Sequence, residues 1–116
     1  MTFPRRGEIY LVEFDPSRGR EIRKTRPAIV IQNDIGNRHS SVTIVAAITS
    51  NVSTHPVTVA VAPTTANGLS VSSAIHLGQI RSVDRQRLVK RLGAVDEATM
   101  GKVDEALQIS LGLVEL

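Results

Sequence analysis

Short runs of β-forming residues, separated by turn residues, make up most of this chain of 116 residues. Each run is rich in apolar, β-branched or aromatic side chains, and the intervening turns contain Gly, Pro, Asn, Asp and Ser. The expected strands are residues 7–14, 27–32, 42–48, 57–61, 73–83 and 89–95. The segment 73–83 can hold one strand or two, and Gly78 marks a bulge or bend within it. Because the connections are short, neighbouring strands are expected to be antiparallel.

A segment of helical periodicity follows the last expected strand. Asp96 is a suitable N-cap, and the helix is expected to run from there to the C-terminus. Its apolar residues fall on two faces, one with Met100, Val103, Leu107 and Leu111 and the other with Ile109, Leu113 and Leu116. One face suffices to cover a small barrel. The second face predicts burial against another copy of the chain, that is, a homodimer, although it can also pack against loops of the same domain.

Together these elements predict an α+β fold, namely a small SH3-like antiparallel β-barrel with a C-terminal α-helix. A chain of this length forms one domain, residues 1–116. No apolar stretch is long enough to span a membrane, and the first residues lack the apolar core of a secretory signal. The chain has no cysteine, which excludes disulfides, cysteine zinc ligands and thiol nucleophiles and fits the reducing cytoplasm.

Basic residues gather in a first cluster just before the second expected strand. The cluster consists of Arg18, Arg20, Arg23, Lys24 and Arg26, with Glu21 the single acid among them. It ends at Pro27, which opens an apolar run, so Arg26 is held at the edge of rigid structure. A guanidinium fixed in this way can bind and stabilise a phosphate. A surface salt bridge between Arg26 and Glu21 is the simpler interpretation, and the sequence leaves both open.

A second basic cluster lies along and after the segment 73–83. It consists of Gln79, Arg81, Arg85, Gln86, Arg87, Lys90 and Arg91. Gln79 and Arg81 alternate with apolar residues and therefore share one sheet face, which is either a surface for a sugar–phosphate backbone or an ordinary solvated face. The net charge of +3 combines −4 over residues 96–116 with +7 elsewhere. This segregation suggests a polyanionic partner, although a basic surface alone is also typical of solvation.

Thr49 ends the most apolar expected strand and opens a polar stretch, where a threonine usually terminates the strand and satisfies a backbone group. The three histidines show no metal-ligand spacing, so no metal site is expected. His39 and His55 are expected to be exposed, and His76 to be half-buried and hydrogen-bonded. No P-loop, dinucleotide fingerprint or Ser-His-Asp set is present, and no cofactor is expected.

Taken in series, five segments resemble the MazF/PemK-like toxins of type II toxin–antitoxin systems. These segments are residues 6–10, 26–34, 45–49, 79–84 and 102–107. Each is weak alone, but their order and spacing fit over almost the whole chain. The stretch 32–38, QNDIGNR, is most similar to the Gram-positive MazF subgroup.

The resemblance implies a homodimeric, metal-independent endoribonuclease toxin that cleaves single-stranded RNA, chiefly mRNA, at a short defined sequence. Attack by the 2′-hydroxyl would leave a 2′,3′-cyclic phosphate and a 5′-hydroxyl, and would inhibit translation and growth. A cognate MazE-like antitoxin with a disordered acidic tail would occupy the RNA groove. The family's catalytic arginine and threonine fall on Arg26 and Thr49. The glutamate that some members carry falls on Glu21, the expected base.

The first basic cluster, Gln79 and Arg81 would then bind RNA, and a hydroxyl role falls on Ser73. Two positions depart from the family pattern. Ser72 stands where an acidic residue commonly precedes the serine, and Gly78 stands where a glutamate is common. Both lie near the expected RNA groove, so the resemblance does not predict the sequence that is cut.

Two functions of other classes remain open from the sequence. A CcdB-like toxin would bind DNA gyrase and leave RNA intact. A non-enzymatic SH3-like module would bind RNA with steep salt dependence but never cut it. The matches at Arg26 and Thr49 favour the nuclease, because the resemblance implies that gyrase toxins lack this pair.

Overall fold

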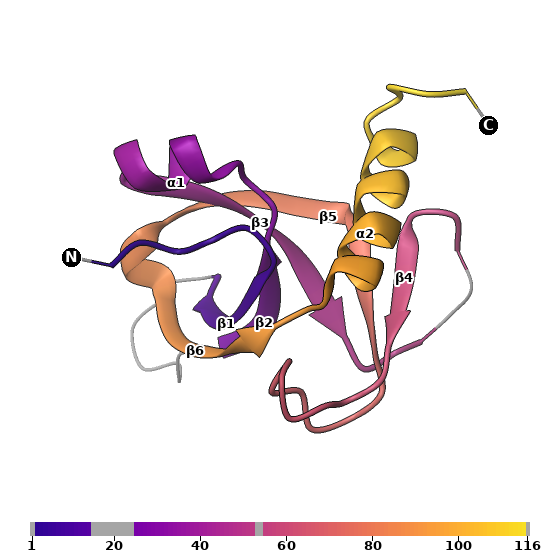
Figure 1. The fold of residues 1–116 in the computed structure, drawn as a ribbon, viewed down its shortest axis with the longest axis horizontal. Helices are drawn as coiled ribbons and strands as arrows, with labels where there is room; N and C mark the ends of the chain where they lie inside the picture. The colour runs from indigo at the N-terminus through magenta and orange to yellow at the C-terminus, as the bar shows by residue number, and fades with distance from the viewer. Residues whose placement is uncertain (1, 15–24, 53–54, 116) are drawn as a thin grey trace, which may run out of the picture.

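The computed structural model describes residues 2–14, 25–52 and 55–115. In chain order the elements are β1 (Glu8–Glu13), β2 (Thr25–Val30), α1 (Asp34–His39), β3 (Val42–Thr49), β4 (Thr58–Val61), β5 (Ser73–Asp84), the 3-10 turn η1 (Arg85–Arg87), β6 (Leu88–Ala94) and α2 (Glu97–Ser110). The strands form one curved six-stranded sheet in the order β4-β5-β3-β2-β1-β6 (Figure 1). Every pairing is antiparallel, and α2 packs against β4 and β5. The predicted α+β fold with an antiparallel sheet and a C-terminal helix is confirmed.

The strands alternate their side chains between two faces of the sheet. The face that α2 covers carries the main core, in which Ile9, Ile29 and Ile75 are fully buried together with Val103 of the helix. The opposite face carries a smaller cluster of Val12, Ala28, Val30, Val45 and Val83. We call this second side the small-core face. Its cluster occupies the middle of the strands, so the strand ends beside it are free to carry polar side chains.

The short helix α1 replaces a stretch that the sequence pattern predicts as a turn. Asn33 caps it by accepting a hydrogen bond from the Gly36 N–H at 2.8 Å. Asn37 is fully buried, and its Oδ1 accepts hydrogen bonds from the Thr43 hydroxyl at 2.6 Å and from Gln32 Nε2 at 3.1 Å. These polar contacts hold α1 against the end of β3. Hydrophobic periodicity does not reveal a helix that is held in this way.

The beginning of α2 is as predicted. The Asp96 carboxylate accepts a hydrogen bond from the Thr99 N–H at 2.8 Å. Hydrogen bonds from the side chain and then from the backbone of Thr99 lower the pKa of the Asp96 carboxyl. No helix in the described part of the chain is long and apolar enough to cross a membrane.

The predicted extension of α2 to the C-terminus is wrong, because the helix ends at Ser110. Gly112 adopts φ +71°, and its N–H donates to the Ile109 carbonyl at 3.1 Å. The N–H of Leu113 donates to the Gln108 carbonyl at 2.8 Å. This pair of bonds is a Schellman motif, which uses the freedom of glycine to close the helix. Leu113 therefore lies beyond the helix and not on a second helical face.

Candidate RNA-binding and catalytic site

The strand register brings Arg26 and Thr49 together. Ala28 pairs with Ala47 and Val30 pairs with Val45 across β2 and β3. The same antiparallel register, extended by two residues, places Arg26 opposite Thr49 on the small-core face. Directly opposed residues of such strands have Cα atoms about 5 Å apart. The pairing of β2 with β3 ends at Ala28 and Ala47, and its continuation makes Arg26 and Thr49 neighbours although they are far apart in the sequence.

The two side chains are presented differently. Arg26 is exposed, and Thr49 is half-buried. Thr49 Oγ1 accepts a hydrogen bond from the Asn51 N–H at 3.1 Å, as expected for a threonine that ends a strand. Its hydroxyl proton stays available as a donor, since accepting this bond uses only a lone pair. A cation and a hydroxyl donor side by side can together hold a phosphate.

Five of the predicted site residues lie outside the described residues. They are Arg18, Arg20, Glu21, Arg23 and Lys24, which all fall within 15–24. Their roles, including that of Glu21 as the base and as a salt-bridge partner of Arg26, stay predictions. In the sequence they come just before β2 and therefore close to Arg26.

Arg81 and Gln79 are both exposed on β5, as the alternation predicts. The Arg81 guanidinium carbon lies 5.3 Å from the centroid of the Phe14 ring, a cation–π contact. Phe14 follows directly after β1, two residues beyond Val12, and Val12 pairs with Arg26. This contact therefore brings the positive charge of Arg81 toward the strand that flanks Arg26.

The structure places Ser73, one of the predicted RNA-binding residues, on the core side of the sheet. It is only 3% exposed, and its hydroxyl donates to the Val71 carbonyl at 2.9 Å. Like Ile75, two residues further along the strand, it lies on the core side of β5. Ala74, on the other side, lies opposite Thr49. The hydroxyl of Ser73 is therefore not presented beside Arg26 and Thr49, and the sequence resemblance alone could not detect this.

A bulge in β5 interrupts the sheet near the pair. Ala47 pairs with His76, but the preceding residue of β3, Ala46, pairs with Ile80. The intervening residues 77–79 include Gly78, the predicted site of a bulge, which is confirmed. His76 is half-buried, and its Nδ1 accepts a hydrogen bond from the Gly78 N–H at 3.0 Å, also as predicted.

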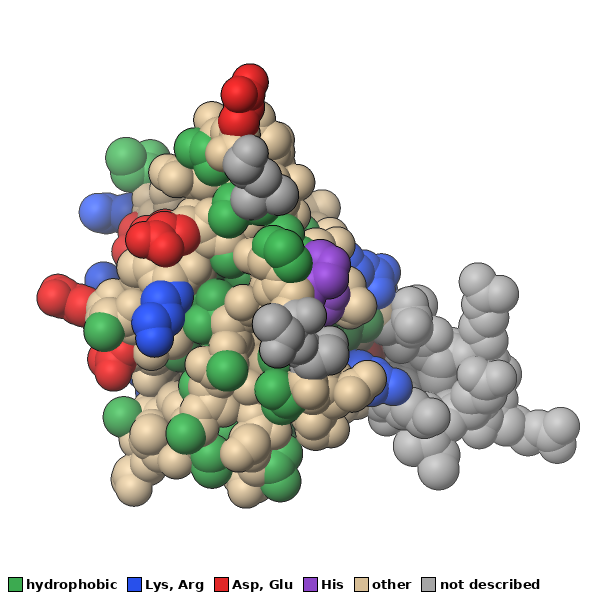
Figure 2. Space-filling view, turned by 90° about the vertical axis from the view of Figure 1, so that its right-hand side faces the viewer, with side chains coloured by type: hydrophobic (Ala, Val, Ile, Leu, Met, Phe, Trp, Pro, Cys, Tyr) green, Lys and Arg blue, Asp and Glu red, His purple; other side chains and the backbone are tan. Residues whose placement is uncertain are grey.

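The sequence does not predict the contact between two histidines. The rings of His55 and His76 have centroids 5.8 Å apart and planes inclined by 30°. Figure 2, which views the molecule from the side of α2 and β4, shows histidine side chains at the surface with Lys or Arg side chains beside them. The two residues belong to different segments, so only the folded chain brings them together. No short motif in the sequence signals the pair.

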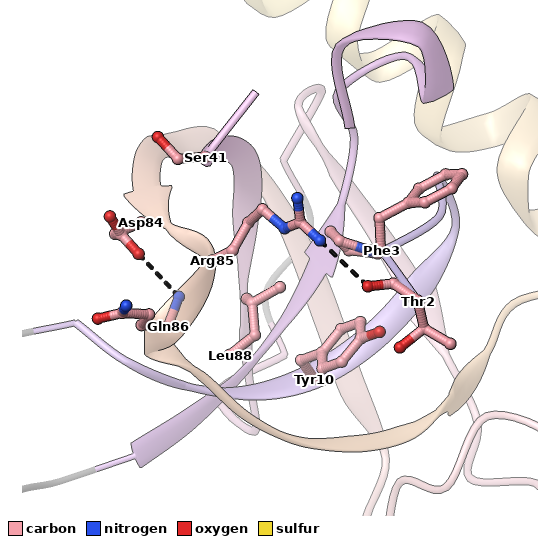
Figure 3. Close-up of a pocket in the computed structure, with 9 residues that line it drawn as sticks. Thr2, Phe3, Tyr10, Ser41, Asp84, Arg85, Gln86 and Leu88 are labelled. Carbon is pink, nitrogen blue, oxygen red and sulfur yellow. Dashed lines mark hydrogen bonds between the residues drawn. The ribbon is translucent and has the colours of Figure 1, made fainter. Parts of the chain in front are cut away.

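A separate hollow of about 440 Å³ lies between the N-terminal segment and η1. Tyr10 and Leu88 lie on one side of it, and the Arg85 side chain reaches over it to donate to the Thr2 carbonyl at 3.1 Å (Figure 3). The Tyr10 hydroxyl donates to Glu8 Oε1 at 3.1 Å. Burial, followed by the charge of Glu8 and this hydrogen bond, raises the pKa of Tyr10 to about 12.

Tyr10 is the only tyrosine, so ultraviolet absorbance of the phenolate reports its ionisation directly. An unfolded tyrosine ionises near pH ~10, and we expect a midpoint of about 12 in the folded protein. Because the pKa is raised on folding, the resulting stability is complete below the unfolded pKa and is lost as the pH rises through the folded pKa. Glu8→Gln should lower the midpoint. A wild-type midpoint near ~10 while circular dichroism stays native would contradict this account.

The six-stranded sheet with its covering helix defines a small α+β fold, in which the exposed Arg26 and the half-buried Thr49 lie on adjacent strands. The chain belongs to the PemK-like, MazF-like toxin family of type II toxin–antitoxin systems, whose family model matches residues 5–111. The resemblance seen in the sequence is thereby confirmed.

Two relatives are similar along nearly their whole length. Endoribonuclease EndoA of Bacillus subtilis is 44% identical over 112 residues, which cover 96% of this chain and 97% of that protein. Endoribonuclease MazF of Staphylococcus epidermidis is 42% identical over 110 residues, covering 94% and 92% respectively. Both relatives come from Gram-positive bacteria, in agreement with the subgroup that the sequence suggested.

Solved structures share the fold. An endoribonuclease in complex with its cognate antitoxin from a mycobacterial species superposes with a TM-score of 0.80 at 27% identity, covering 97% of this chain and 99% of that chain. MazF from Deinococcus radiodurans superposes with a TM-score of 0.76 at 26% identity, covering 97% and 99%. The six-stranded sheet and its C-terminal helix are therefore the architecture of known MazF toxins.

Proposed function

We propose that this chain is an endoribonuclease toxin that cuts single-stranded RNA, chiefly mRNA, at a short defined sequence and without a metal ion. The observation that carries the proposal is the pairing of Ala28 with Ala47, whose continuation by two residues puts Arg26 opposite Thr49 at a sheet end. The names of the two relatives, both endoribonucleases, support the same activity. The toxin domain spans residues 1–116 and acts in the cytoplasm, where it inhibits translation and growth.

The reaction is a transesterification within the RNA. The 2′-oxygen attacks the adjacent phosphorus, its proton passes to a base, and the bond to the 5′-oxygen breaks as that oxygen gains a proton. The products are a 2′,3′-cyclic phosphate and a 5′-hydroxyl. Such a reaction needs a proton acceptor, a proton donor and stabilisation of the charge on the pentavalent phosphorus.

Arg26 and Thr49 stabilise the charge that develops on the pentavalent phosphorus. A guanidinium keeps its proton and presents planar donors, so Arg26 binds the non-bridging oxygens and offsets their growing charge. The Thr49 hydroxyl donates to a non-bridging oxygen or orients the attacking 2′-hydroxyl. Glu21 is the proposed base. Arg81, Gln79 and the remaining residues of the first basic cluster hold the RNA backbone on either side.

Two partners follow from the proposal. Leu111, Leu113 and Val114 beyond α2 are 57%, 70% and 43% exposed, and this exposed apolar surface supports a homodimer in which a second copy covers it. A MazE-like antitoxin with an acidic disordered tail would complement the exposed arginines, in line with the solved toxin that is bound to its cognate antitoxin. Sedimentation at several concentrations tests the homodimer, with Leu113→Glu as the variant that should shift it to monomers.

Induction of the chain in a bacterial host distinguishes this proposal from a gyrase-binding toxin. We expect growth arrest with fragmented transcripts and intact chromosomal DNA. Arg26→Ala should abolish the arrest while the protein accumulates to the same level. Intact transcripts together with DNA breaks trapped on gyrase would instead assign the chain to the CcdB-like class.

A further inference from the structure

His76 is held in one orientation at the edge of the proposed RNA site. It lies between Ala47 of β3 and Thr58 of β4 in the sheet. Its Nδ1 accepts the Gly78 N–H at 3.0 Å, and its ring packs against that of His55 at 5.8 Å. A ring with these two restraints is fixed before any ligand arrives. Polar groups held in place on a rigid strand are typical of recognition sites.

The hydrogen bonds determine which ring nitrogen carries the proton. Nδ1 of His76 accepts from Gly78, and Nδ1 of His55 accepts from the Val57 N–H at 3.3 Å. A neutral imidazole has one donor and one acceptor nitrogen, so the proton of each ring is assigned to Nε2. His76 therefore offers an N–H donor, and not an acceptor, to whatever binds beside it.

The orientation of the His76 ring depends on the absence of a side chain at position 78. A Cβ at position 78 would lie 2.8 Å from Cε1 of His76, closer than real contacts allow, and 3.1 Å from its Nδ1, which is a tight contact. A side chain at position 78 and the imidazole in this orientation are therefore mutually exclusive. The absence of a side chain at position 78 therefore leaves room for the imidazole of His76 in its present orientation.

The position of His76 relative to the reacting phosphate is set by the strand register. Thr49 lies opposite Ala74, and His76 is two residues further along β5 on the same face. Two residues of a strand span about 7 Å. This displacement fits a nucleotide next to the cleaved bond, not the scissile phosphate itself.

We propose that His76, supported by His55 and Gly78, determines which base is accepted next to the cleaved bond. Its Nε2–H donates to the carbonyl oxygen of a keto base, that is, O4 of uracil or O6 of guanine. Cytosine and adenine present an amino group at the same point, which would face another donor. The inference rests on the ribonuclease function proposed above and adds a preference for keto over amino bases.

The test uses short RNAs that are identical except for the two nucleotides flanking the mapped cut, each varied through all four bases. For the wild-type protein, kcat/KM should favour a keto base at one of these positions by about tenfold, the discrimination expected of one buried hydrogen bond. His76→Ala should remove that preference. His76→Gln, which keeps an N–H donor near the position of Nε2, should retain most of it. The double variant His76→Ala with Gly78→Glu should reverse it toward amino bases.

His39→Ala is the matched control, because His39 is exposed at the end of α1, just before the start of β3, whereas Thr49 is at the other end of that strand. It should leave the preference unchanged. Binding of the same RNAs to Arg26→Ala protein gives a second readout that needs no cleavage, and the keto preference should appear there as a ratio of Kd values. If His76→Ala cuts keto and amino RNAs in the wild-type ratio, or if the wild-type protein cuts both equally well, the inference is wrong while the nuclease stands. If the wild-type protein cuts none of the RNAs, the proposed function fails, and this inference fails with it.

Discussion

Replacing Arg26 with alanine is expected to lower kcat/KM for RNA cleavage by about a hundredfold or more, the usual effect of losing one preorganised donor to a developing charge. The side chain is exposed at the end of β2 and is no part of either apolar core. The thermal midpoint should therefore change little. Single-turnover cleavage of a defined RNA, together with thermal unfolding, measures the two quantities independently.

Two further variants sharpen this prediction. Arg26→Lys keeps the positive charge but loses the planar fork, so it should restore only part of the rate. Arg38→Ala removes an exposed arginine from α1 and controls for a loss of general positive charge. A wild-type rate in Arg26→Ala, or an equal loss in Arg38→Ala, would show that Arg26 has no particular role in the chemistry.

Replacing Gly93 with alanine is expected to destabilise the fold by about 3 kcal/mol or more, because the added methyl group has no space. A Cβ at Gly93 would lie 2.2 Å from the carbonyl oxygen of Ala66 and 2.6 Å from the carbonyl carbon of Asn67. Both contacts are with backbone, which cannot rotate away as a side chain can. The Ala94 N–H donates to the same Ala66 carbonyl at 2.9 Å, which holds the two segments together.

Gly101 provides the matched control for this substitution. It lies on an exposed part of α2, where a Cβ would meet nothing within 4 Å. Gly101→Ala should stabilise the protein by about 0.5 kcal/mol, since alanine has the higher helix propensity. Denaturant unfolding of the two variants should give shifts of opposite sign. If both variants unfolded at the same denaturant concentration, the close approach of Gly93 to the loop would be refuted.

The sequence pattern predicts the elements that depend on local periodicity. The strands, the bulge at Gly78 and the Asp96 cap all follow from residues that are neighbours in the chain. The α1 helix does not, because the buried amide of Asn37 holds it through contacts that periodicity cannot show. The end of α2 could have been predicted from Gly112, whose positive φ closes the helix.

The candidate site, too, could be predicted from the sequence only in part. The residue types at Arg26 and Thr49 suggest phosphate chemistry, but spacing cannot show that the two residues are opposite each other, since this depends on the register of β2 and β3. Ser73 faces the core because of its position on β5, which the family pattern does not specify. The contact between His55 and His76 arises only when β4 and β5 pair.

In the proposed mechanism, Arg26 and Thr49 cut RNA without a metal ion. The most direct measurement incubates the pure protein with a long single-stranded RNA in EDTA and maps the new ends. We expect discrete cuts at one short sequence, 5′-hydroxyl and 2′,3′-cyclic phosphate ends, and no cuts with Arg26→Ala. Intact RNA across several long substrates, or cutting that EDTA abolishes, would contradict it.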